Sequence, residues 1–408
     1  MTWWRSRSLP RRGKDDAGVN RTVGLLCLII FVNTLSIGAF PVLLPEIGRS
    51  NGVEYFALGA IAGAFGLARV FADIPAGLFI THHLRRALVI GVVSVAAGVI
   101  CLGVGGPYAM LVTGRTLSGI GHALSMLGGL TAIIRYGPAG SRGLSLNAFE
   151  MSGMLGVLCG MIAAGFLPER WPWNVTFLAA SAPQALALAL LAPVLRTLPA
   201  DTNAGGTRLL FSRGEADGGG GSRARISRTT IVAFVGGCVI AVAWSSTGQF
   251  VLPIRASRDF DLGRESVALL LSIPQVFDVL LLLPVGLLAD RTSHARVLAI
   301  VLVSMAAGVV AIGFGSMPVV IVGCGLFGMG LAGWMLPVSL INQEGSARGA
   351  SWRTALYRTG VDAGVFLGPV LSGLLIQFDV LWTLTATTTA GLLGLSAMLY
   401  RVPNHRER

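Results

Sequence analysis

Ionisable residues inside long apolar stretches are the first feature of this sequence that suggests chemistry. They are Arg69, Asp73, Arg115, His122, Glu150, Asp278, Arg358 and Asp362. A charge at membrane depth costs several kcal/mol, so such residues are functional candidates unless a neighbour neutralises them. The sequence has no G-x-x-x-x-G-K-[ST] nucleotide motif, no cysteine–histidine metal cluster and no evident nucleophile–base spacing. We therefore expect no enzyme, no ATP-driven pump, no metal and no cofactor.

Four of these residues form two oppositely charged pairs. Arg69 and Asp73 lie four residues apart, and so do Arg358 and Asp362. Residues at this spacing share one face of a helix. Each pair could simply neutralise itself within one helical turn. Alternatively, the four residues could form a network that breaks and re-forms when the protein changes conformation.

Two further carboxylates, Glu150 and Asp278, have no opposite charge beside them on their own helices. A carboxyl group without a partner in a low-dielectric environment is favoured in its protonated form, so it can bind a proton near neutral pH. Asp278 is the first candidate for a proton-coupling residue, and Glu150 and Asp362 are the others. Glu150 could instead lie close enough to the cytoplasm to reach water or Arg142.

Several other polar residues could line a cavity. Arg115 could bind an anionic substrate or tune a nearby carboxylate. His122, two turns further along, could relay protons or be a buried neutral histidine bonded to a backbone carbonyl. Asn33 and Gln249 could face a cavity or form hydrogen bonds between helices.

Composition indicates that all these residues belong to a membrane protein. Hydrophobic residues make up 53% of the 408 residues and charged residues only 12%, whereas soluble domains carry about 25% charged residues. A spanning helix needs about 20 mostly apolar residues, and the sequence contains twelve such stretches. They are 22–44, 55–80, 87–104, 107–133, 143–167, 173–195, 229–253, 266–289, 297–314, 317–341, 354–376 and 380–400. We predict an all-α membrane fold with twelve transmembrane helices.

Glycine, arginine and serine dominate 196–228, which cannot bury enough apolar surface to fold and is predicted to be a flexible linker. It divides the chain into two six-helix halves, 22–195 and 229–400, flanked by a basic tail at 1–21 and a short tail at 401–408. Arginines cluster in both tails, in the linker and in alternate loops. Positive loops stay on the cytoplasmic side of a membrane. We therefore expect a protein of the cytoplasmic membrane whose termini and linker all lie in the cytoplasm. The net charge of +12 lies in these short loops, so no nucleic-acid partner is expected.

The two halves resemble each other in sequence. Pro75 and Gly77 align with Pro284 and Gly286. A second set of glycines also repeats, with Gly156, Gly160 and Gly165 matching Gly364, Gly368 and Gly373. A parallel repeat of six helices suggests two pseudo-symmetric halves with a binding site between them near the membrane midplane.

Short motifs on this frame are similar to those of the major facilitator superfamily. GLLADRTSHAR begins at Gly286 and has Asp290 in the acidic position, whereas GLFITHHLRRA in the first half has Thr81 there. The fourth stretch carries RTLSGIGHA and the eleventh GVFLGPVLSG. The fifth stretch has Gly160–Met161 where efflux members usually have a Gly-Pro pair. The resemblance covers nearly the whole chain and implies alternating access by rocking of the two halves.

The resemblance also implies specific contacts. In this superfamily helices 2 and 11 face each other and run antiparallel, so Arg69 is expected to meet Asp362, and Asp73 to meet Arg358. These residues, with Arg115, would form a gating and charge network. Asp290 would hold the inner gate shut through a neighbouring helix N-terminus or arginine.

Three functions remain open from the sequence. The first is proton-coupled export of a small, partly apolar molecule, the second is import by a proton symporter or uniporter, and the third is a non-transporting receptor or scaffold. Sign-alternating buried charges argue against the third. Expected partners are a small-molecule substrate, protons and membrane lipids, and we expect a monomer.

Overall fold

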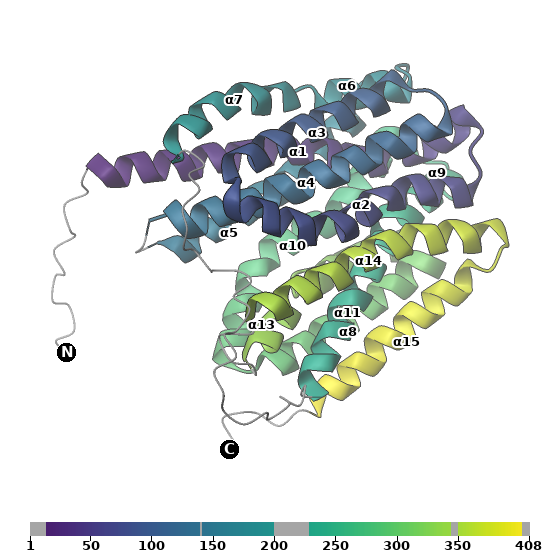
Figure 1. Ribbon diagram of the computed structural model, residues 1–408. Helices are drawn as coiled ribbons and strands as arrows, with labels where there is room; N and C mark the ends of the chain where they lie inside the picture. The colour runs from purple at the N-terminus through teal and green to yellow at the C-terminus, as the bar shows by residue number, and fades with distance from the viewer. Residues whose placement is uncertain (1–13, 139–140, 200–227, 344–349, 402–408) are drawn as a thin grey trace, which may run out of the picture.

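The computed structural model describes residues 14–138, 141–199, 228–343 and 350–401. Within these ranges the chain is helical and contains no strand. Figure 1 shows the helices as two groups lying side by side, the first half purple to teal and the second teal-green to yellow. The predicted all-α membrane fold of twelve spans in two halves is confirmed. The predicted linker lies largely outside the described residues.

The first half supplies six spans, of which the last is broken. Its helices are α1 (Lys14–Asn51), α2 (Tyr55–His82), α3 (Leu84–Val104), α4 (Tyr108–Tyr136), α5 (Arg142–Phe166), α6 (Trp173–Ser181) and α7 (Gln184–Thr197). The break between α6 and α7 falls at Pro183, which has no backbone N–H to donate to a helix. The turn between α3 and α4 uses Gly105 and Gly106, both with positive φ, a backbone conformation that glycine tolerates.

The second half also supplies six spans, and two of them are interrupted. Its elements are α8 (Arg228–Ala243), the π-helix η1 (Trp244–Val251), α9 (Leu252–Arg258), α10 (Arg264–Arg291), α11 (His294–Phe314), α12 (Met317–Leu331), α13 (Leu336–Gln343), α14 (Ala350–Gln377) and α15 (Leu381–Tyr400). The seventh span therefore carries a π-helix at mid-length, a feature that occurs often at functional sites. The tenth span bends between α12 and α13.

Eleven of the helical spans are long and apolar enough to cross a membrane by length and composition alone. The exception is α15, which contains a run of threonines. The hydroxyls of Thr383, Thr385 and Thr387 donate to backbone carbonyls of the same helix or its N-cap, at 2.6, 3.4 and 2.8 Å. These bonds satisfy the hydroxyl groups internally, so their polarity does not prevent the helix from packing beside α11 and α8.

The repeated glycines have the same packing role in both halves. A β-carbon at Gly156 or Gly160 would press on the backbone of α1, and one at Gly364 or Gly368 would press on α8 or η1. The third glycine of each set faces the opposite half instead: Gly165 lies against Ala268 of α10, and Gly373 lies against Tyr55 of α2. The sequence repeat therefore corresponds to a structural repeat, and it also determines where the halves touch.

The helical bundle has two faces, which we name by their position relative to the chain termini. The termini face is the end at which α1 begins and α15 ends, and the far face is the opposite end, at which α1 ends and α2 begins. The halves meet along two lines of contact, α2 against α14 and α5 against α10. Every candidate charge described below lies on these helices or on α4, which packs against α2.

Replacing Gly160 by leucine tests the close approach of α5 to α1. We expect the variant to be about 1–3 kcal/mol less stable, because the new side chain would collide with the carbonyl group of Leu35. Thermal unfolding of the detergent-solubilised protein, followed by tryptophan fluorescence, measures this. The control is Gly143→Leu at an open position on the same helix. Equal melting temperatures for both variants would contradict the packing role.

Candidate functional site

Three glycines bring α2 and α14 into backbone contact near the far face. Gly59, Gly63 and Gly66 lie on one stripe of α2, and a β-carbon at each would press on the backbone of α14. The same stripe continues toward the termini face through Arg69 and Asp73, at helical spacings of three and four residues. Close glycine packing thus brings the charged residues of α2 within reach of those of α14.

Two ion pairs join the halves at this point. Arg69 Nη2 lies 2.7 Å from Asp362 Oδ1, and the Asp362 side chain is 0% exposed. Arg358 Nε lies 3.9 Å from Asp73 Oδ2, a longer and more open contact. Both pairs cross from α2 to α14, as the antiparallel arrangement predicts. A static pairing within each helix is therefore not what the structure contains.

Other candidate residues gather around these pairs. The charges of Arg69 and Arg358 both act on Glu150 of α5 and on His122 of α4. The ring of Phe65 lies between Arg69 and His122, 5.6 Å from the Arg69 guanidinium carbon and 5.6 Å from the histidine ring centre. The structure therefore brings together six of the predicted residues in one charged cluster: Arg69, Asp73, His122, Glu150, Arg358 and Asp362.

Arg115 lies next to this cluster, and the described residues give it no ion pair. Its side chain is buried, with the residue 7% exposed, and its guanidinium carbon lies 3.9 Å from the ring centre of Phe40 and 4.9 Å from that of Phe65. Nη2 donates to the carbonyl of Ala62 at 3.4 Å, and Nε has no partner. Aromatic faces thus stabilise this charge, and the carboxylate that Arg115 was expected to tune is not adjacent to it.

Asp278 is buried at mid-length of α10 and remains without a cation among the described residues. The residue is 8% exposed, and its Oδ2 accepts a 3.4 Å hydrogen bond from Gln275 while Oδ1 has no partner. Asp278 belongs to one stripe of α10, because residues spaced alternately four and three apart lie on the same face of a helix. The stripe consists of positions 264, 268, 271, 275 and 278. Because Ala268 on this stripe touches Gly165 of α5, the stripe faces the other half.

The two amide residues predicted to line a cavity differ in position. Asn33 is 0% exposed, and its amide group is fully engaged: it donates to Ser125 Oγ at 3.3 Å and accepts from Gln184 Nε2 at 2.6 Å. Asn33 therefore ties α1, α4 and α7 together instead of facing a cavity. Gln249 is half-buried in the π-helix, next to the buried Thr247 and Gly248.

Asp290 contacts a histidine of its own half. Its side chain is 71% exposed, and Oδ1 lies 3.4 Å from Nε2 of His294, the first residue of α11. Within the described residues it contacts no arginine of a neighbouring loop. The inner-gate contact of Asp290 is therefore not formed in the part of the chain that the structure describes, and it stays a prediction.

The sequence analysis missed a buried arginine at the far face. Arg264, the first residue of α10, forms a two-pronged ion pair with Glu46 of α1, with N–O distances of 2.7 and 2.6 Å. It also donates to Thr176 Oγ1 at 2.7 Å and to the carbonyls of Pro168 and Trp171 at 3.2 and 2.9 Å. All these partners belong to the other half.

Glu169 strengthens the same contact. Its Oε1 accepts a hydrogen bond from the backbone N–H of Arg264 at 2.9 Å, so a residue of the first half caps the N-terminus of a helix of the second half. We call the group formed by Arg264, Glu46, Glu169 and Thr176 the far-face latch. The sequence does carry a signal for Arg264, because this residue lies on the same helical stripe as Asp278.

Comparison with known proteins agrees with this architecture. The family model described as Major Facilitator Superfamily matches residues 26–209 and 233–408, which is nearly the whole chain. The chain belongs to the Major Facilitator Superfamily. The paired halves, the glycine contacts and the α2–α14 ion pairs are therefore features of a transporter fold.

Solved structures with the same fold include three transporters of low sequence identity. A bacterial homologue of the human lysosomal transporter Spinster, in an inward-facing and unoccupied conformation, has a TM-score of 0.70 at 14% identity and covers 95% of this chain and 97% of its own. The nucleoside transporter NupG has a TM-score of 0.70 at 14% identity, with 94% and 100% covered. A POT family transporter in complex with 5-aminolevulinic acid has a TM-score of 0.73 at 17% identity, with 94% and 97% covered.

One curated relative matches part of the chain. The multidrug resistance protein Stp of Mycobacterium tuberculosis (strain CDC 1551 / Oshkosh) is 28% identical over 156 residues. This segment is 38% of the present chain and 28% of the length of Stp. The match supports membership of a transporter family, and the chain aligns with well under two thirds of that relative.

Removing Arg69 alone should destabilise the protein more than removing both members of its pair. Arg69→Gln leaves Asp362 buried without its ion-pair partner, and breaking a buried pair in this way costs about 3–5 kcal/mol. Adding Asp362→Asn removes that orphaned charge and should restore much of the loss. Thermal unfolding of the two single variants and the double variant forms the test. A double variant as unstable as the sum of the singles would rule out the cross-half pair as the source of the effect.

Proposed function

We propose that this protein is a proton-coupled secondary transporter that exports a small, partly apolar molecule by alternating access. The observation that carries the proposal is the buried ion pair between Arg69 and Asp362, one from each half. Separating the halves would leave each charge in a low-dielectric environment, at a cost of several kcal/mol. A protein that only held its halves together would be served equally well by apolar contacts, so the charges suggest a contact that changes during function.

The far-face latch supports a conformation closed at that face. The Arg264 side chain contacts Glu46, Pro168, Trp171 and Thr176, all of the first half, whereas among the described residues Asp290 at the termini face pairs with His294 of its own half. The bacterial Spinster homologue, which has the same fold, adopts an inward-facing conformation in its crystal structure. Since positive loops lie at the termini face, we infer that the termini face is cytoplasmic and that the structure is open toward the cytoplasm.

Asp278 is the residue best suited to carry the coupled proton. It lies 14 residues from Arg264 on α10, or about 21 Å along the helix, which is near the middle of the bilayer. It faces the other half and has only an amide partner, so protonation would relieve a buried negative charge. Asp362 and Glu150 differ from Asp278, because the charges of Arg69 and Arg358 act on both of them, and this suits them to gating.

Export is the direction favoured by the relative named as a multidrug resistance protein. Import by a proton symporter or uniporter is the alternative, and the two differ in the sign of the gradient that drives accumulation. Proteoliposomes with a pH gradient of either sign, screened with small amphipathic fluorescent dyes and small metabolites, test the proposal. Export predicts substrate movement against the proton flow, and transport that ignores the gradient would contradict proton coupling.

Replacing Asp278 by asparagine should abolish transport against a gradient while leaving exchange of substrate across the membrane measurable. Asparagine keeps the shape of the side chain but cannot release a proton. The measurement compares gradient-driven uptake with counterflow in the same proteoliposomes. Glu150→Gln is the matched control and should have a weaker effect. If Asp278→Asn still concentrates substrate, then Glu150 or Asp362 becomes the candidate proton carrier.

Breaking the far-face latch should raise access to the interface from that side. Leu271 lies on the latch-bearing stripe of α10 and is buried, so a cysteine placed there, with the five native cysteines replaced, reports opening. We expect Arg264→Gln to raise its maleimide labelling rate about tenfold or more, because Glu46 and Glu169 lose their shared partner. Arg49→Gln, at an exposed arginine in the last turn of α1 on the same face, is the control. Unchanged labelling in Arg264→Gln would contradict the latch.

A further inference from the structure

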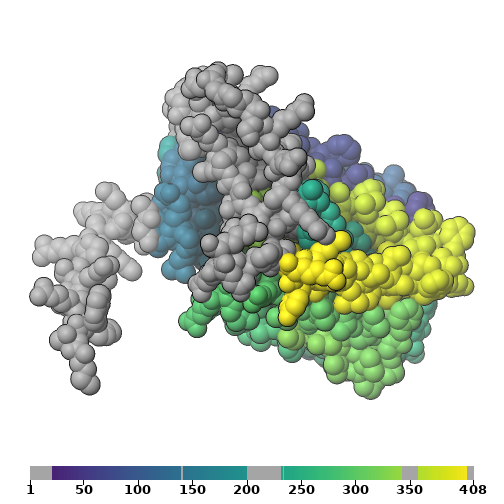
Figure 2. All heavy atoms as spheres, turned by 90° about the horizontal axis from the view of Figure 1, so that it is seen from below, coloured from purple at the N-terminus to yellow at the C-terminus, as the bar shows by residue number. Residues whose placement is uncertain are grey.

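A groove on the outer surface of the second half lies away from the charged cluster. It runs between α11 and α15 at the termini face and has a volume of about 470 Å³. Figure 2 shows α15, in yellow, on the surface of the molecule beside the green helices of the same half. We propose that this groove binds one anionic glycerophospholipid, with an acyl chain along the groove and the phosphate group at its termini-face end.

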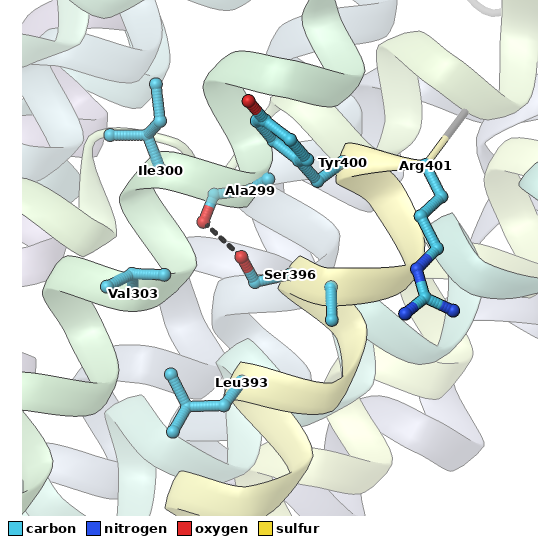
Figure 3. A pocket seen from close by; sticks show the side chains of 8 residues that line it. Ala299, Ile300, Val303, Leu393, Ser396, Tyr400 and Arg401 are labelled. Carbon is cyan, nitrogen blue, oxygen red and sulfur yellow. Dashed lines mark hydrogen bonds between the residues drawn. The ribbon is translucent and has the colours of Figure 1, made fainter. Parts of the chain in front are cut away.

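Small residues form the floor of the groove. Ser396 Oγ donates to the carbonyl oxygen of Ala299 at 2.8 Å, which holds α15 close to α11 and uses the serine hydroxyl (Figure 3). Ala299, Ser396 and Ala397 have no long side chains to fill the space above this bond. Two helices that approach through small residues leave a channel between the larger residues on either side.

The walls of the groove are apolar and exposed. Ile300 and Val303 lie on the exposed stripe of α11, and Leu393 lies on the facing stripe of α15. Tyr400 closes the termini-face end, with 70% of its surface exposed. Aliphatic walls suit an acyl chain, and tyrosine is enriched at the level of lipid head groups. The ring of Tyr400 therefore marks the depth at which the acyl chain of the bound lipid ends and its head group begins.

Two arginines place positive charge at the termini-face end of the groove. Arg401 follows Tyr400 and lines the groove (Figure 3). Arg296, in the first turn of α11, is exposed and lies one turn before Ile300 on the same stripe. The arginines thus come from both helices that form the groove. A cationic end on an apolar groove complements an anionic lipid, whereas a zwitterionic lipid without net charge would gain less from the arginines.

Native mass spectrometry of the full-length protein in detergent tests the proposal. The probes are phosphatidylglycerol and phosphatidylcholine with identical acyl chains. We expect phosphatidylglycerol to be retained with at least about tenfold higher affinity, and Arg401→Gln and Arg296→Gln each to lower that affinity about fivefold. Ala397→Phe should fill the groove and lower the binding of both lipids. These three positions are exposed, and equal melting temperatures would verify that the variants are folded.

Arg142→Gln is the matched control, because Arg142 is an exposed arginine at the start of α5 on the same face. It should leave phosphatidylglycerol binding unchanged. Equal retention of the two lipids, or equal losses in the control and the groove variants, would overturn the proposal. Losses in the arginine variants without any loss in Ala397→Phe would also overturn it, since binding would then be surface attraction outside the groove.

Discussion

The cost of holding a charge in a low-dielectric environment is the constraint on which the rest of this structure depends. Asp362 has no exposed side-chain surface, so its negative charge must be compensated by a nearby cation. That cation, Arg69, comes from the other half of the molecule. The position of one half relative to the other is therefore linked to the neutralisation of a buried charge, and no movement of the halves is free of an electrostatic consequence.

The surroundings of this pair provide second partners. Arg358 acts on Asp362 as well as on Asp73, and both arginines act on Glu150. Asp362 and Glu150 thus each feel two cations. A change in the angle between the halves could exchange partners without leaving a charge alone, which lowers the barrier to movement compared with a single isolated pair. Arg115 is different, because the rings of Phe40 and Phe65 stabilise it within its own half.

The glycine contacts between helices repeat in the two halves, whereas the positions of the charged residues do not. The glycine triplets of α5 and α14 contact equivalent helices in the two halves. The far-face latch, by contrast, differs from the contact on the other line: Arg264 pairs with Glu46 where Gly165 meets α10, whereas near Gly373 the amide of Gln377 donates one hydrogen bond to Glu54 at 2.8 Å. Because the glycine packing is symmetric, the α2–α14 and α5–α10 contacts have a common geometry. Because the charged residues differ, the two contacts differ in electrostatic strength. Among the described residues, the α5–α10 line therefore carries the stronger electrostatic contact at the far face.

Much of the architecture could be predicted from the sequence, because its causes are local. Apolar stretches of about 20 residues define spans, and the glycine repeat marks where helices approach. The crossing of Arg69 to Asp362 and of Asp73 to Arg358 also followed from spacing, once helices 2 and 11 were taken to face each other. Only the tertiary structure decided the roles of Asn33 and Arg264. Asn33 could equally have faced a cavity, but Ser125 and Gln184, far away in sequence, occupy its amide. Arg264 stands at a helix N-terminus, a site that disfavours a cation, and it is stabilised there by Glu46, which is 218 residues away in the chain. A partner at that separation leaves no pattern in a single sequence, because it is the packing of the two halves that brings the groups together.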